Sequence, residues 1–180
     1  MNQQKKLYDK IYNNPNLPKY GHTTHGDIWK VDILELNPES WLDVGCGHNI
    51  LIKEVKKYWN VQDCLGVDFS CPSADENCDI LDMPFEDKRW DFLTAFDVME
   101  HLLPEQITKA FDEMKRVSKR FAFTICYVEA ITIIDGENVH ATVWPKDKWI
   151  DIIKQYGKLY DKSQPSFNET NGFFIGEWKK

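Results

Sequence analysis

The sequence predicts an α/β fold, a doubly wound and mostly parallel sheet that ends in a C-terminal antiparallel hairpin. Short apolar segments alternate with helix-compatible segments along the 180 residues, which is typical of βαβ units. Residues 90–96 are nearly all apolar, as expected of a parallel strand that is buried on both faces. Residues 41–49 run from apolar side chains through two glycines into a helix-compatible segment, which predicts a strand, a tight turn and a helix N-terminus.

Two helices are expected before this core, one over about residues 5–12 and one from Asp27 to about Asn37. A proline-rich break at residues 13–18 separates them. The first half of the core then predicts four strands and one helix. These are the strands 41–44, 62–68, 78–81 (brief at most) and 90–96, and the helix 49–58.

The second half of the core predicts a helix over residues 104–118, opened by Pro104 in the first turn. A strand over 121–128, a turn over 135–138 and a helix over 146–156 follow. Strands near 158–160 and 172–178 complete the hairpin. We interpret residues 1–180 as a single domain, in which residues 1–40 form a helical lid or side wall and residues 41–180 form the core.

The composition excludes several classes of protein. The net charge of −7 disfavours a surface that follows nucleic-acid phosphates. The five cysteines form no C-x-x-C pair, and the seven-residue spacing of Cys64, Cys71 and Cys78 is not that of a structural zinc site. No apolar run approaches membrane length, and free thiols suit a reducing compartment, so we expect a cytoplasmic protein.

The glycine turn predicts a ligand site. Gly45 and Gly47 are followed by Ile50 where a dinucleotide fingerprint requires its third glycine, so that fingerprint is absent. Asp68 ends the next predicted strand, 21 residues after Gly47, and its carboxylate can accept both hydroxyls of a ribose. Both features belong at the carboxyl ends of the strands, where ligands bind in such sheets.

Four segments in this order resemble the motifs of the class I S-adenosylmethionine-dependent methyltransferases, whose sheet is Rossmann-like. Residues 42–47 are similar to the first motif, and residues 65–68 to the second, which carries the ribose-binding acid. Residues 78–85 resemble the adenine-contacting segment, and residues 96–102 resemble the "V-L-E-H" run of small-molecule methyltransferases. The resemblance covers roughly residues 41–128.

The resemblance implies that S-adenosyl-L-methionine is the cofactor and that a small molecule accepts the methyl group. It also implies which residues contact the cofactor. They are Asp43, Gly45, Cys46, Gly47, Asp68, Phe69, Asp79, Ile80 and Phe96.

The first motif departs from the family's pattern at one position, because Asn49 stands where a further glycine is usual. Asparagine tolerates left-handed backbone geometry, so the turn can form. His48 and Asn49 are expected near the methionine end of the cofactor and would crowd it. The turn-rich residues 69–77 after Asp68 are also too short and broken for a crossover helix. A non-catalytic S-adenosylmethionine-binding accessory protein is therefore an alternative. A protein or RNA methyltransferase is a third, disfavoured by the charge and by the absence of an N/D-P-P-Y/F motif after the predicted strand 90–96.

Methyl transfer needs a general base only if the acceptor atom must lose a proton. We predict His140 and His101 as candidate bases, although His101 can equally fix its loop by hydrogen bonding. Four further side chains are candidate substrate contacts. These are Tyr20, His22, His25 and Trp144. No metal site is predicted, because the histidines show no paired spacing. The oligomeric state is left open.

Overall fold

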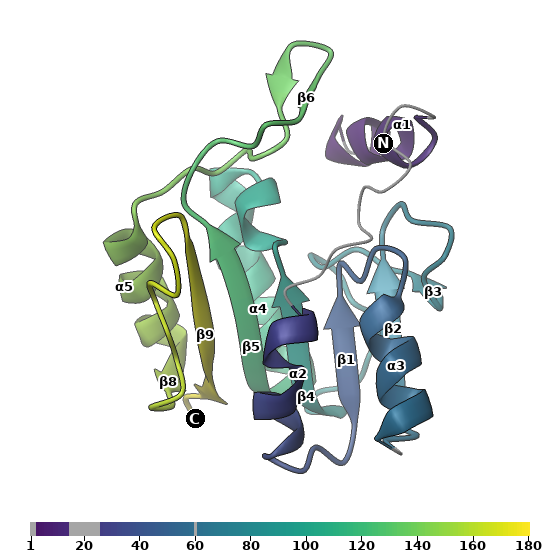
Figure 1. The fold of residues 1–180 in the computed structure, drawn as a ribbon, viewed down its shortest axis with the longest axis vertical. Coiled ribbons are helices and arrows are strands. Elements are labelled where there is room, and N and C mark those ends of the chain that lie inside the picture. Colours follow the sequence, from purple (N-terminus) through teal and green to yellow (C-terminus); the bar gives the residue numbers. More distant parts are fainter. Residues whose placement is uncertain (1–2, 15–25, 60) are drawn as a thin grey trace.

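The computed structural model describes residues 3–14, 26–59 and 61–180 of the chain. Its centre is a seven-stranded sheet with the strand order β3-β2-β1-β4-β5-β9-β8 (Figure 1). β9 runs antiparallel to both of its neighbours, whereas the pairs from β3 to β5 are parallel. The strands are β1 (Trp41–Val44), β2 (Cys64–Asp68), β3 (Glu76–Asn77), β4 (Trp90–Phe96), β5 (Ser118–Cys126), β8 (Gly157–Leu159) and β9 (Asn171–Trp178).

Helices cover both faces of this sheet. α2 and α3 pack on one face, where Trp29, Leu51 and Val55 meet residues of β1 and β4. α4 and α5 contribute to the core of the other face. The helices are α1 (Gln3–Tyr12), α2 (Gly26–Leu34), α3 (Ile50–Tyr58), α4 (Ile107–Val117) and α5 (Lys146–Tyr156), with 3₁₀ turns at Met99–His101 and Pro104–Gln106. Among the described residues, no helix combines the length and the apolar character needed to cross a membrane.

Two segments stand apart from the helical layers, at the end of the sheet where β1, β2 and β4 finish (Figure 1). One is α1. The other is a small antiparallel hairpin formed by β6 (Ile133–Ile134) and β7 (Glu137–Asn138). A turn with positive φ at Asp135 and Gly136 joins its strands. These two segments stand where a ligand site is expected in a doubly wound sheet.

The packing of α4 and β9 explains the C-terminal half of the sheet. The apolar face of α4 is fully buried, and Phe111 lies with its ring centroid 5.9 Å from that of Phe123. The rings of Phe121 and Trp178 are 4.3 Å apart between centroids. Trp178 Nε1 donates to the buried Ser118 Oγ at 2.8 Å, so the indole nitrogen keeps a partner inside the core.

The predicted class of fold is confirmed, and so are the bounds of β1, β4 and α5 and the antiparallel hairpin. The predicted strand over residues 78–81 is wrong. The short strand beside β2 is instead the exposed and polar pair Glu76–Asn77, which no apolar pattern marks. No crossover helix separates β2 from β3, as expected from the turn-rich sequence.

Candidate active site

A cavity of about 730 Å³ lies at the carboxyl ends of the central parallel strands. Its wall comes from segments far apart in the chain, including α1, the turn after β1 and the hairpin segment after β5. All nine residues that the resemblance assigned to the cofactor line this cavity. They are Asp43, Gly45, Cys46, Gly47, Asp68, Phe69, Asp79, Ile80 and Phe96.

The glycine turn follows directly after β1. Gly45 and Gly47 have φ values of 70° and 51°, a left-handed geometry that glycine adopts without strain. A Cβ at Gly45 would also lie 2.5 Å from Val98 Cγ2, so there is no room for a side chain. The turn is tied to the neighbouring strand by the Cys46 N–H, which donates to the Val67 carbonyl at 3.0 Å. The result is a wall of bare backbone at the N-terminus of α3.

Asn49 adopts the left-handed conformation expected of it, with φ 59° and ψ 35°, and caps α3 without blocking the cavity. Its side chain is fully buried and faces β2, where a Cβ at Gly66 would lie 2.0 Å from Asn49 Oδ1. His48 also lies outside the cavity lining, with Nδ1 3.2 Å from Ser73 Oγ. The expected crowding of the methionine end by these two side chains is therefore wrong.

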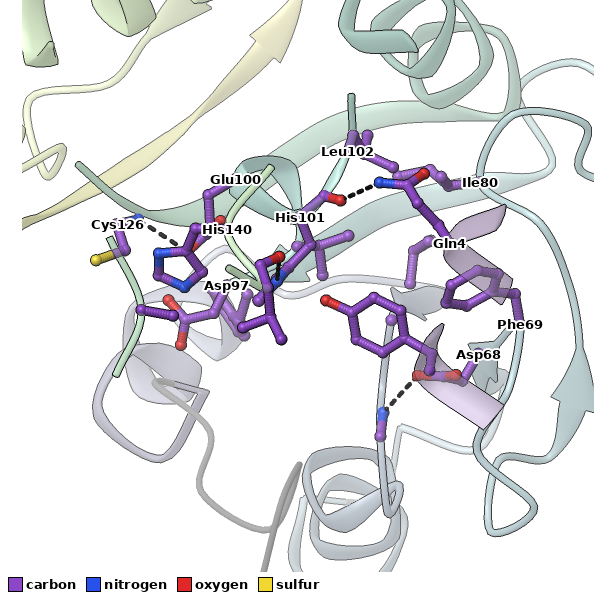
Figure 2. Close-up of a pocket in the computed structure, with 18 of the residues that line it drawn as sticks. Gln4, Asp68, Phe69, Ile80, Asp97, Glu100, His101, Leu102, Cys126 and His140 are labelled. Carbon is purple, nitrogen blue, oxygen red and sulfur yellow. Dashed lines mark hydrogen bonds between the residues drawn. The ribbon is translucent and has the colours of Figure 1, made fainter. Parts of the chain in front are cut away.

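Asp68 stands at the end of β2, and backbone groups hold its carboxylate in place. Its Oδ1 accepts from the N–H groups of Ser70 and Cys71, both at 2.8 Å. Its Oδ2 accepts from the Gly47 N–H at 3.2 Å (Figure 2). The same oxygen accepts from the Tyr12 hydroxyl at 3.4 Å. The carboxylate thus links the two predicted motifs and presents one oxygen to the cavity side.

The segment after β3 contributes to the cavity although it forms no strand. Asp79 Oδ1 accepts from the Leu81 N–H at 2.9 Å, which folds the segment into a turn. Ile80 is mostly buried, with 7% of its surface exposed, and lines the cavity together with Phe96 from β4. An acid and an apolar residue thus lie side by side, as the adenine-contacting motif requires.

Asp43 is buried on β1 beneath the turn. Thr94 Oγ1 donates to Asp43 Oδ1 at 2.5 Å and itself accepts from Trp41 Nε1 at 3.0 Å. Burial raises the pKa of Asp43 to about 7, although the Thr94 hydrogen bond opposes the rise and the nearby Asp68 adds to it. The Asp43 carboxyl therefore gains or loses its proton when the pH changes around neutrality.

α1 forms one wall of the cavity, a contribution that the sequence indicated only in general terms. The Gln4 side chain donates to the His101 carbonyl (Figure 2). The ring of Tyr8 lies 5.3 Å from that of Phe69 and 5.7 Å from that of His101, measured between centroids. The N-terminal helix therefore connects the cofactor side of the cavity with its far side.

The far side carries a cluster of acids and histidines. The 3₁₀ turn Met99–His101 supplies Glu100 and His101, and the segment after β7 brings in His140. The two imidazole rings meet edge to face, with centroids 4.8 Å apart and planes at 78°. Asp97, which precedes the turn with φ 54°, lies beside the cluster (Figure 2). The structure thus unites the two predicted histidines with a carboxylate that the sequence analysis did not single out.

Burial dominates the electrostatics of this cluster. It raises the pKa of Glu100 well above its usual range, and the nearby Asp97 carboxylate raises it further. Burial also lowers the pKa of His101 to about 4, and His140 adds to this shift. A histidine with so low a pKa is a weak proton acceptor at neutral pH, which argues against His101 as a general base.

The remaining predicted substrate contacts do not meet in this cavity. Tyr20, His22 and His25 lie outside the described residues. Trp144 is absent from the cavity lining and packs against Trp149, with ring centroids 4.9 Å apart. A substrate role for these four side chains remains a prediction.

Comparisons with known proteins agree with this geometry. Residues 42–126 match a family model described as "Methyltransferase domain". No curated protein matches the sequence.

Solved structures match over most of the chain. The PH0226 protein from Pyrococcus horikoshii has a TM-score of 0.66 and 16% identity, over 99% of this chain and 100% of its own. The Burkholderia thailandensis 1,6-didemethyltoxoflavin-N1-methyltransferase, solved with its substrate and S-adenosylhomocysteine, has a TM-score of 0.66 and 14% identity, over 98% and 87%. The methyltransferase domain of bacterial CtHen1-CN has a TM-score of 0.61 and 15% identity, over 86% and 97%.

Proposed function

We propose that this chain, which has the fold and the domain of the class I S-adenosylmethionine-dependent methyltransferases, transfers a methyl group to a small-molecule acceptor. The cofactor is S-adenosyl-L-methionine. The observation that carries the proposal is a single cavity with two sides. The motif residues line one side, and the cluster around Glu100 lines the other.

The enclosure of the cavity supports a small acceptor. α1 and the segment that leads into the β6–β7 hairpin both contribute to the lining. No lysine or arginine is among the described residues that line it, whereas Asp43, Asp68, Asp79, Asp97 and Glu100 are. Such a lining favours a neutral or cationic acceptor over an anionic one. The Burkholderia thailandensis neighbour, which is named as an N1-methyltransferase, was solved with bound 1,6-didemethyltoxoflavin, a small molecule.

The residues present fit the cofactor. The bare backbone at Gly45 and Gly47 would accommodate the methionine part, because both glycines line the cavity without a side chain that could cover it. Asp68 would hold the ribose, while Asp79 and Ile80 would meet the adenine edge and face. When bound, the sulfonium supplies an electrophilic methyl group with a good leaving group. The task of the protein is then to align the acceptor and exclude water.

The alternative of a non-catalytic binding protein loses one of its two supports. It was motivated by Asn49, whose side chain is buried against β2 and leaves the cavity open. Its other support, the missing crossover helix after β2, concerns the edge of the sheet and not the cavity.

Calorimetry with S-adenosylmethionine and S-adenosylhomocysteine tests the cofactor side. Both should bind to the wild type, and Asp68→Asn should weaken binding about 10- to 100-fold, since a charge-assisted hydrogen bond to a buried carboxylate is removed. Asp63→Asn is the matched control, because this exposed carboxylate pairs with Arg89 away from the cavity. Equal affinity in Asp68→Asn and the wild type would contradict the assignment. Methylation of a compound in a screen of small acceptors would then separate the enzyme from the accessory protein.

A further inference from the structure

We propose that Glu100, His101 and His140 form a binding site for a divalent transition-metal ion on the acceptor side of the cavity (Figure 2). Potential ligand atoms of the three side chains all lie within 4.8 Å of one another. Ligand atoms around a tetrahedral ion at about 2.1 Å are about 3.4 Å apart, so a closing movement of roughly 1 Å would complete the site. The spacing of the histidines did not predict this site, because only the fold brings His140 to the other two residues.

Glu100 provides the first argument. The side chain is fully buried, and Oε1 accepts from the Cys126 N–H at 2.9 Å. Its other oxygen, Oε2, is buried and has no hydrogen-bond partner. A buried carboxylate oxygen without a partner is costly, and Glu100 is a cavity residue, so a cation there would satisfy it.

The two histidines provide the second argument. His101 Nδ1 lies 2.9 Å from the Val139 carbonyl oxygen, and His140 Nδ1 lies 2.6 Å from the Val128 carbonyl oxygen. A carbonyl oxygen only accepts, so in the neutral imidazole each Nδ1 carries the proton and each Nε2 has the lone pair. Donation from one ring nitrogen to a backbone carbonyl is the usual arrangement behind a metal-bound histidine, since it fixes the tautomer and the ring plane.

These backbone contacts alone could serve only to position the loops. That explanation does not account for Glu100, which buries an unpartnered carboxylate oxygen next to two such rings. It also does not explain why Asp97 lies beside Glu100, since no lysine or arginine among the described lining residues offsets these two acidic groups. A divalent cation explains all of these features together.

The donor set indicates the kind of ion. Two imidazole nitrogens and one carboxylate suit Zn²⁺, Mn²⁺, Fe²⁺ or Co²⁺, whereas Mg²⁺ and Ca²⁺ prefer oxygen ligands. Three protein ligands leave at least one position open, which is the pattern of a catalytic rather than a structural site. The open position would face the cavity.

The site also indicates the acceptor atom, an inference that rests on the proposed function. A hydroxyl oxygen has two lone pairs, so it can bind a cation with one and attack the methyl group with the other. An amine nitrogen has a single lone pair, and binding to the cation would occupy it. The cation also lowers the pKa of the hydroxyl. Transfer would form the bond between the acceptor oxygen and the methyl carbon and break the bond between that carbon and sulfur. The electron pair stays on sulfur, and the hydroxyl proton goes to water. The acceptor class is therefore an alcohol or a phenol.

Titration of the chelator-treated full chain with Mn²⁺, followed by calorimetry and electron paramagnetic resonance, tests the metal site. The wild type should bind one ion, and Glu100→Gln and His140→Ala should each weaken binding about 100-fold or more. Glutamine keeps an oxygen for the Cys126 N–H, so Glu100→Gln should retain the fold. His48→Ala removes a histidine outside the cavity and should bind Mn²⁺ as the wild type does. With Co²⁺, the visible spectrum of the wild type should show ligand-field bands that His140→Ala lacks.

Absence of Mn²⁺ and Co²⁺ binding to the wild type, or unchanged affinity in both Glu100→Gln and His140→Ala, would overturn the site. Binding of Mn²⁺ without any binding of S-adenosylmethionine would refute the proposed function and leave the metal site standing. Paired screens of alcohols and amines, with Mn²⁺ and with chelator, test the acceptor. Turnover of an alcohol that needs Mn²⁺ supports the assignment, and turnover of amines at the same rate with chelator overturns it.

Discussion

Replacing Asp43 by asparagine should change how the stability of the protein depends on pH. The carboxyl is 4% exposed, and its pKa is raised from 3.8 to about 7, mainly by burial. Asparagine has nearly the same shape and can still accept from Thr94 Oγ1, but it cannot ionise. The difference between the two proteins therefore isolates the cost of charging a buried group.

The direction and size of the effect follow from the two pKa values. Below about pH 4 the group is protonated in both the folded and the unfolded state, so folding carries no penalty from its charge. Between about pH 4 and pH 7 the folded state alone holds the proton, and the free energy of unfolding falls by about 1.4 kcal/mol for each pH unit. The loss reaches about 4 kcal/mol and is complete above pH 7.

Urea denaturation at several pH values from 4.5 to 8 gives the free energies of unfolding of both proteins. The free energy of unfolding of Asp43→Asn minus that of the wild type should rise by about 3 kcal/mol between pH 4.5 and pH 7 and then level off. Titration of the Asp43 carboxyl carbon by nuclear magnetic resonance in the folded wild type gives its pKa directly. A difference that stays flat across this range, with the carboxylate already ionised at pH 5, would refute the reasoning.

Two further substitutions test the turn and the core. Gly45→Ala should lower the free energy of unfolding by about 2–4 kcal/mol in urea denaturation, because alanine is strained at φ 70° and its Cβ would meet Val98. If Gly45→Ala/Val98→Ala recovers part of this loss, the collision is one of its causes. A Gly45→Ala variant as stable as the wild type would contradict the prediction. Ser118→Ala should cost about 1–3 kcal/mol in the same assay, because Trp178 Nε1 is then buried without an acceptor; a loss below about 0.5 kcal/mol would mean that the indole finds another partner.

The fold was predictable from the sequence where burial leaves a pattern. β4 is buried on both faces and therefore reads as an apolar run, and α4 shows its buried face at helical spacing. β3 left no such trace, because its two residues are polar and exposed at a sheet edge, where backbone pairing and a hydrogen bond from Asn77 Nδ2 to the Phe69 carbonyl hold them. α3 shows a weaker pattern, since Leu51, Ile52 and Val55 are buried whereas Tyr58 at its end is 62% exposed.

The residues predicted to bind the cofactor line one cavity, and they could be selected from the sequence because the motifs that contain them are local. Each lies in a short segment at the end of one strand, so order along the chain is sufficient to recognise them. The Glu100 cluster was not, since His140 reaches it only after β5 and the β6–β7 hairpin return the chain to the cavity. Burial of Glu100 is a tertiary property as well. The adjacency of Glu100 and His101 was the only local sign.

Asn49 packs against Gly66, so the effect of a substitution at one of these positions should depend on the residue at the other. The turn needs a left-handed residue, and an asparagine there needs space that the absence of a side chain on β2 provides. Gly66→Ala should be less harmful beside glycine than beside asparagine, although the new Cβ would still lie 3.1 Å from Cys46 Sγ, so a double-mutant cycle through Asn49→Gly should show strong coupling. A sequence pattern that requires glycine at the position of Asn49 therefore specifies a residue type. The fold itself requires a left-handed backbone conformation at this position and, for asparagine, space for the side chain on the neighbouring strand β2.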